Sequence, residues 1–75
     1  MPTLFKTGAA RVVMYVGDHP PPHVHVILSD GRDCTVNLSN QRIVGTIAAG
    51  EIRAPLSWIN ANLRQLLANW ERLNP

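Results

Sequence analysis

Hydrophobic and polar residues alternate with a period of two along much of the first two-thirds of the chain, as in β-strands that have one buried face. The alternation is clear at residues 33–38, and residues 10–16 are rich in β-branched and aromatic side chains. Asp30-Gly31 suits the tight turn of a hairpin, because glycine tolerates a positive φ. We therefore expect an antiparallel meander of four to five strands. The candidate strands are residues 3–6, 10–16, 23–28, 33–38 and 42–47.

From Ala49 onward the hydrophobic period becomes that of an α-helix. At about 100° per residue the apolar side chains fall on one stripe. The members of this stripe are Ile52, Leu56, Ile59, Leu63, Leu66, Leu67, Trp70 and Leu73. Because Pro55 lacks a backbone N–H and Asn60 and Asn62 are weak helix formers, we expect one kinked helix or two short helices. The chain is thus predicted to be a single α+β domain, residues 1–75, with this helical segment packed on one face of the sheet.

Trp58 lies off the apolar stripe. A straight helix would leave its ring at the flank, where a large exposed aromatic side chain is a candidate contact for a partner protein. A kink could instead turn the ring inward, and the sequence leaves both alternatives open.

The chain has 75 residues, and a domain of this size buries only about 60% of its unfolded surface. A partner protein or a second copy would add burial. The sole cysteine, Cys34, cannot form an internal disulfide, which suits a reducing compartment. The sequence contains no signal-peptide pattern and no apolar run long enough to span a membrane. We therefore expect a cytoplasmic protein that does not enter membranes.

The charge of the chain permits nucleic-acid binding without indicating it. Seven Lys and Arg residues stand against five Asp and Glu residues, a formal net charge of +2, and the basic residues are scattered singly. No dense basic patch is present of the kind that drives counterion release. If the first two strands carry Lys6 and Arg11 to the same face as the histidines, a modest anion-binding groove would result.

The richest chemistry lies at residues 18–26, which contain all three histidines and three of the six prolines. Histidine exchanges protons near neutral pH and is the commonest metal ligand. Prolines stiffen the run. In an extended polyproline segment the backbones of His19 and His23 would be roughly 12 Å apart, unless the run turns, for example through a cis proline.

His23 and His25 form a closer pair. In a strand at 23–28 they would share one face, roughly 6.5 Å apart, while the alternating valines and Leu28 face the core. Two imidazoles that face water at this spacing can bind a metal, grip a phosphate or act as acid and base, with Asp18 orienting one of them. They can also be ordinary polar residues of an outer sheet face.

A metal centre has a limited set of ligands here. Zinc normally takes four, and besides the histidines the chain offers Cys34 and a few carboxylates, none at zinc-finger spacing. We therefore predict no resident cofactor. The alternative is a divalent metal bound by His23 and His25 together with Asp18 or His19.

The chain resembles a prokaryotic family of small proteins, domain of unknown function 4160, over nearly its whole length. The resemblance rests on the opening Met-Pro-Thr, on a histidine-proline motif, and on the closing Trp-Ile and Leu-Leu-Ala-Asn-Trp-Glu-Arg segments. The motif is carried by Tyr15, Asp18, His19, Pro21, Pro22, His23, Val24, His25 and Val26. The sequence departs from the family pattern at Pro55, where an ordinary helix former is usual, and at Asn62, where a histidine is common.

The resemblance implies an uncharacterised protein whose gene often lies beside that of another small domain, in pairs resembling toxin-antitoxin modules. It therefore implies a partner protein encoded nearby, and it implies no reaction. A homo-oligomer is the alternative that follows from the small core.

Our leading hypothesis is a toxin-like protein that cleaves RNA as a ribonuclease does. His23 and His25 would act as acid and base with His19 and Asp18 assisting, and Lys6, Arg11 and Tyr15 would contact the substrate. One alternative is a non-catalytic module that docks a protein through a sheet edge or Trp58. The other is a small metal-binding regulatory domain.

Overall fold

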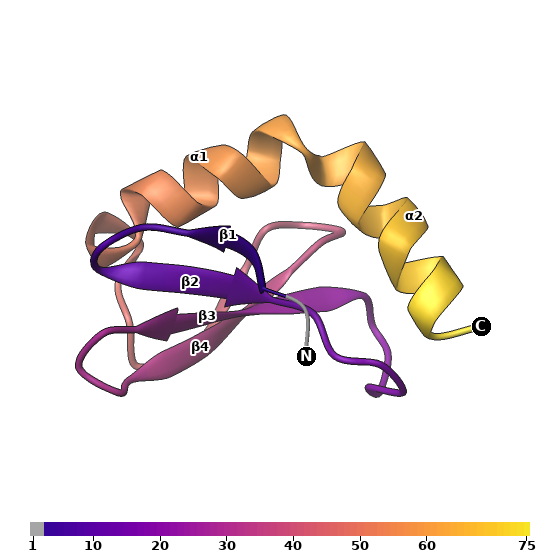
Figure 1. Ribbon diagram of the computed structural model, residues 1–75, viewed down its shortest axis with the longest axis horizontal. Coiled ribbons are helices and arrows are strands. Elements are labelled where there is room, and N and C mark those ends of the chain that lie inside the picture. Colours follow the sequence, from indigo (N-terminus) through magenta and orange to yellow (C-terminus); the bar gives the residue numbers. More distant parts are fainter. Residues whose placement is uncertain (1–2) are drawn as a thin grey trace.

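Five short strands form one antiparallel sheet with the order β1-β2-β3-β4-β5, which confirms the predicted meander. The fold is that of a computed structural model that describes residues 3–75 (Figure 1). Met1 and Pro2, which begin the Met-Pro-Thr part of the family resemblance, lie outside the described residues. The strands are β1 Thr3–Lys6, β2 Ala10–Val13, β3 His23–Leu28, β4 Asp33–Asn37 and β5 Ile43–Gly45.

Three of the predicted strands are shorter than expected, and the segment 33–38 ends one residue early, at Asn37. The segment 10–16 leaves the sheet after Val13, because the following residues form the loop that carries Asp18. The segment 42–47 pairs with β4 only from Ile43 to Gly45, where glycine takes a φ of +141°.

The C-terminal segment forms two short α-helices, one of the two outcomes predicted. A 3₁₀ turn at Ala49–Glu51 precedes α1 Arg53–Ala61 and α2 Leu63–Leu73. Pro55 is the third residue of α1, where a backbone N–H has no intrahelical partner, so it is accommodated in the first turn. The break falls at Asn62, whose side-chain Nδ2 donates to the Trp58 carbonyl at 2.9 Å.

The helices arch over one face of the sheet and enclose the core there (Figure 1). The predicted core residues of β3, Val24, Val26 and Leu28, are buried, as are Val12 and Val36 of the neighbouring strands. Four members of the helical stripe are also buried: Ile52, Ile59, Leu66 and Trp70. In the described residues no helix has the length and apolar character needed to cross a bilayer.

Trp58 turns toward the sheet. Its ring is half-buried and stacks on Phe5 of β1, with 5.1 Å between the centroids and 21° between the planes. Of the two alternatives left open by the sequence, the structure favours the inward one.

Candidate functional site

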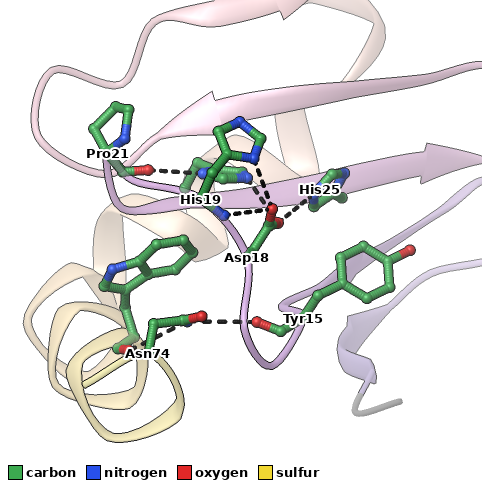
Figure 2. Close-up of polar contacts among 8 residues, drawn as sticks. Tyr15, Asp18, His19, Pro21, His25 and Asn74 are labelled. Carbon is green, nitrogen blue, oxygen red and sulfur yellow. Dashed lines mark hydrogen bonds and ion pairs between the residues drawn. The ribbon is translucent and has the colours of Figure 1, made fainter.

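A single carboxylate, that of Asp18, contacts all three histidines of the chain (Figure 2). Its Oδ2 atom accepts hydrogen bonds from Nε2 of His23 at 2.9 Å and Nε2 of His25 at 3.1 Å. Its Oδ1 atom accepts the backbone N–H of His19 at 2.9 Å and lies 3.0 Å from His19 Nδ1. We call these four residues the Asp18 cluster.

The proline run turns and thereby brings His19 to the cluster. The Pro20–Pro21 peptide is cis, and the ring centroids of His19 and His23 are 5.2 Å apart. The run is therefore not the extended spacer that would have separated the two histidines. The backbone N–H of Leu38 donates to the Pro22 carbonyl at 2.9 Å and ties the end of the run to the chain beyond β4.

His23 does not face water, contrary to our expectation for the outer face of β3. Its side chain is 7% exposed because Asp18 and the proline run cover it, and its ring centroid lies 5.0 Å from that of Trp70. Nδ1 lies 2.7 Å from the Pro21 carbonyl, while Nε2 lies against the Asp18 carboxylate. Since the carbonyl oxygen can only accept, Nδ1 of His23 donates to it, and Nε2 is engaged by the Asp18 carboxylate.

His25 and His19 each use one ring nitrogen on Asp18 and keep the other available. No described residue hydrogen-bonds to Nδ1 of His25 or to Nε2 of His19. The His25 side chain is 22% exposed, and its ring meets Tyr15 edge-on with centroids 4.7 Å apart. The His19 side chain is 81% exposed. The two histidines that can exchange protons with a ligand are therefore His19 and His25.

Asp18 is ionised at neutral pH. Burial by itself would raise the pKa of its carboxyl, but hydrogen bonds from His25 and from the His19 backbone, together with the charge of His23, outweigh burial and lower the pKa to about 2. The carboxylate can therefore hold imidazole N–H groups or a cation over the physiological pH range.

Three members of the cluster also have the spacing of metal ligands. Asp18, His23 and His25 each offer one ligand atom, and these atoms all lie within 4.8 Å of one another. The structure thus assembles the sequence-predicted pair His23 and His25 around the predicted aspartate.

A family model described as "Domain of unknown function (DUF4160)" matches residues 10–71. The chain belongs to the DUF4160 family. The matched residues include the whole Asp18 cluster and all but the first strand of the sheet. No match was found among curated proteins or among solved structures.

In this DUF4160 chain a pocket of about 190 Å³ adjoins the cluster. It is lined by His19, Pro21, His23, Thr35, Asn37 and Val44. Our sequence reasoning missed Thr35 and Asn37. The strand pairing could have pointed to them, because Asn37 lies opposite His23 and Thr35 opposite His25 in the β3–β4 register.

Lys6 and Arg11 lie on the same sheet face as His25. Arg11 pairs with Ile27, two residues from His25 on β3, and Lys6 pairs with Arg11. Both basic residues line a second pocket, of about 400 Å³, together with residues of the β1–β2 and β3–β4 turns. The two basic residues therefore share the histidine face, as the groove would require, but no residue of the Asp18 cluster lines this pocket.

Asn74 is a further residue that no sequence pattern singled out. Its Nδ2 donates to the carbonyls of Trp70, at 3.3 Å, and of Tyr15, at 3.4 Å (Figure 2). It thereby connects the end of α2 to the loop that carries Asp18.

Proposed function

We propose that this DUF4160 chain is the toxin-like half of a toxin-antitoxin-type pair and cleaves phosphodiester bonds of RNA in the cytoplasm. The observation that carries the proposal is the shared carboxylate: Asp18 fixes two imidazoles through one nitrogen each and leaves His25 Nδ1 and His19 Nε2 available. A pair of oriented imidazoles, one basic and one acidic, is suited to RNA cleavage by its own 2′-hydroxyl.

In this proposal His25 is the general base and His19 the general acid. Nδ1 of His25 takes the proton of the 2′-hydroxyl, and the oxygen forms a new bond to phosphorus. The bond from phosphorus to the 5′-oxygen breaks, and that oxygen takes a proton from Nε2 of protonated His19. The products are a 2′,3′-cyclic phosphate and a free 5′-hydroxyl.

The geometry favours His19 over His23 as the second proton-transfer group. Both ring nitrogens of His23 are already engaged, by Pro21 and Asp18, and its side chain is buried. His23 instead holds the Asp18 carboxylate in place from the buried side of the cluster.

Lys6 and Arg11 would hold a neighbouring phosphate of the same strand. Along a β-strand, residues two apart are separated by roughly 6.6 Å, which is close to the spacing of successive phosphates in extended RNA. A strand whose reactive phosphate lies at His25 can therefore place another at the basic pocket next to Ile27. Tyr15 stays a proposed substrate contact, since its ring borders His25.

The proposal is tested with purified protein, a single-stranded RNA oligonucleotide and EDTA in the buffer. We expect cleavage that leaves a cyclic phosphate and that falls at least about 100-fold in His25→Ala and in His19→Ala. Arg64→Ala, an exposed change on α2, is the matched control and should keep the wild-type rate. Equal cleavage of an oligonucleotide with 2′-deoxyribose at the scissile position would contradict the mechanism.

A second test is expression of the chain alone in a bacterial host. Growth arrest that His25→Ala relieves is the expected result. Arrest that survives both His25→Ala and His19→Ala would contradict a catalytic role for the cluster.

The non-catalytic alternative, docking of a protein through Trp58, has less support because the ring stacks on Phe5. Under that alternative the histidine variants would leave complex formation intact and Trp58→Ala would weaken it. Co-purification of the histidine variants and of Trp58→Ala with a protein encoded by a neighbouring gene measures complex formation and separates the two proposals.

A further inference from the structure

We infer that Asp18, His23 and His25 form a binding site for one divalent transition-metal ion. The inference rests on the placement of three ligand atoms and on the groups that hold them, and it does not depend on RNA cleavage.

The ligand spacing is close to that of a bound ion. Around a tetrahedral ion with bonds near 2.05 Å, neighbouring ligand atoms are about 3.3 Å apart. Oδ2 of Asp18 lies 2.9 Å from Nε2 of His23 and 3.1 Å from Nε2 of His25. The three ligand atoms stay within 4.8 Å of one another, so small movements of side chains would admit the ion.

The surroundings of His23 are those of a metal-binding histidine. Such a residue commonly donates its other ring N–H to a backbone carbonyl, which fixes the ring and its tautomer. Here Nδ1 lies 2.7 Å from the Pro21 carbonyl, and the Trp70 ring packs against the imidazole. Tyr15 restrains the ring of His25 in a similar way from the other side.

The donor set selects the class of ion. Two imidazoles and one carboxylate suit Zn²⁺, Co²⁺, Ni²⁺ or Fe²⁺, whereas Mg²⁺ and Ca²⁺ prefer oxygen ligands. Cys34 is buried in the core on the helix side of the sheet, so a thiolate does not contribute. Three protein ligands leave one position for water or a ligand.

The ion and the acid-base chemistry exclude each other. An ion on Nε2 of His25 leaves the proton of that ring on Nδ1, which then cannot act as a base. If both proposals hold, Zn²⁺ inhibits RNA cleavage and EDTA restores it. The two can also fail separately, because binding of the ion is measured without RNA and cleavage is measured in EDTA.

The test is titration of the untagged, chelator-treated protein with Co²⁺, followed by its visible absorption, and with Zn²⁺, followed by calorimetry. We expect one equivalent to bind. Asp18→Asn and His25→Ala should each weaken the affinity by more than about tenfold. His19→Ala is the matched control, since it also removes a histidine of the Asp18 cluster, and its affinity should stay within about threefold of wild type.

Three results would overturn the inference: no saturable binding by the wild type, equal loss in His19→Ala and His25→Ala, or equal affinity for Mg²⁺. Far-UV circular dichroism of each variant shows whether it is folded. If Asp18→Asn fails to fold, the metal affinity of His25→Ala alone tests the inference. This variant is expected to fold, because the His25 side chain is partly exposed and packs less tightly.

Discussion

Asp18 shows how one residue organises a small site. Its side chain is 16% exposed and accepts hydrogen bonds through both oxygens, so its charge is satisfied by the three histidines and not by water. A carboxylate in this position orients each imidazole by accepting one N–H, and it thereby determines which ring nitrogens stay available.

The first prediction at this scale concerns acid stability in EDTA. The pKa of Asp18 is lowered from 3.8 to about 2, so the group stabilises the folded state above pH 4 and loses this contribution as the pH falls toward 2. Asp18→Asn should lower the free energy of unfolding by about 1–2 kcal/mol at pH 7, after allowance for solvent screening, and by almost nothing at pH 2. Urea unfolding at both pH values measures this.

The control is Asp33→Asn, because Asp33 is exposed and its side chain forms no hydrogen bond to another described residue. It should change stability by less than about 0.5 kcal/mol at either pH. An equal effect of the two substitutions would show that the Asp18 cluster contributes no stability.

The second prediction compares two histidines of the cluster. His23→Ala removes a buried imidazole that contacts Asp18 and packs on Trp70, so we expect a loss of about 3 kcal/mol. His19→Ala changes an exposed side chain and should cost less than about 0.5 kcal/mol. Thermal and urea unfolding at pH 7 give both values, and a similar cost for the two would contradict the burial of His23.

At the scale of elements, the end of the meander depends on a glycine. Gly45 closes β5 opposite Cys34 of β4, with a φ of +141° that side chains rarely adopt. A Cβ atom there would lie 2.9 Å from Cβ of Cys34. The edge strand can therefore pair closely with β4 only because this position has no side chain.

We accordingly predict that Gly45→Ala destabilises the domain by at least about 2 kcal/mol, through both the backbone conformation and the clash with Cys34. Gly50→Ala is the matched control, because a Cβ at Gly50 meets no atom within 4 Å and its φ is not positive. Its stability should equal or slightly exceed that of the wild type. Urea unfolding of both variants checks the difference.

At the scale of the whole molecule, the site lies where the sheet, the 14–22 loop and the end of α2 meet. Trp70 belongs to the core under the helices and also packs against His23. Asn74 holds the loop through the Tyr15 carbonyl. Since no single element contains the site, its geometry depends on the packing of α2.

The corresponding prediction is that Asn74→Ala loosens the loop. Loss of the hydrogen bonds to Tyr15 and Trp70 should cost about 1 kcal/mol and raise the amide exchange rate within residues 14–22 several-fold. Asn60→Ala is the control, because Asn60 is exposed and its side chain forms no hydrogen bond to another described residue. Hydrogen exchange detected by mass spectrometry compares the two, and an unchanged loop in Asn74→Ala would contradict the connection.

Much of the architecture follows from the sequence because it depends on local patterns. The alternation in 23–28 placed Val24 and Val26 in the core, and the bounds of β1 and β3 match the prediction. The helical stripe placed Ile59 and Trp70 correctly, and the break falls at Asn62, one of three residues near which it was expected. The ends of strands were less predictable. Strand β2 ends at Val13 and strand β5 at Gly45, and both ends depend on contacts with residues distant in the sequence.

The sequence by itself determined the α+β meander, the buried face and the concentration of the histidines in one short segment, because periodicity and residue type are local properties. Only the tertiary structure decided which role each residue of the Asp18 cluster has. The turn of the proline run brought His19 to Asp18, and the covering of β3 by that run and Trp70 engaged both nitrogens of His23. Those contacts join segments far apart along the chain, and hydrogen-bond partners across such distances are set by packing and not by spacing in the sequence.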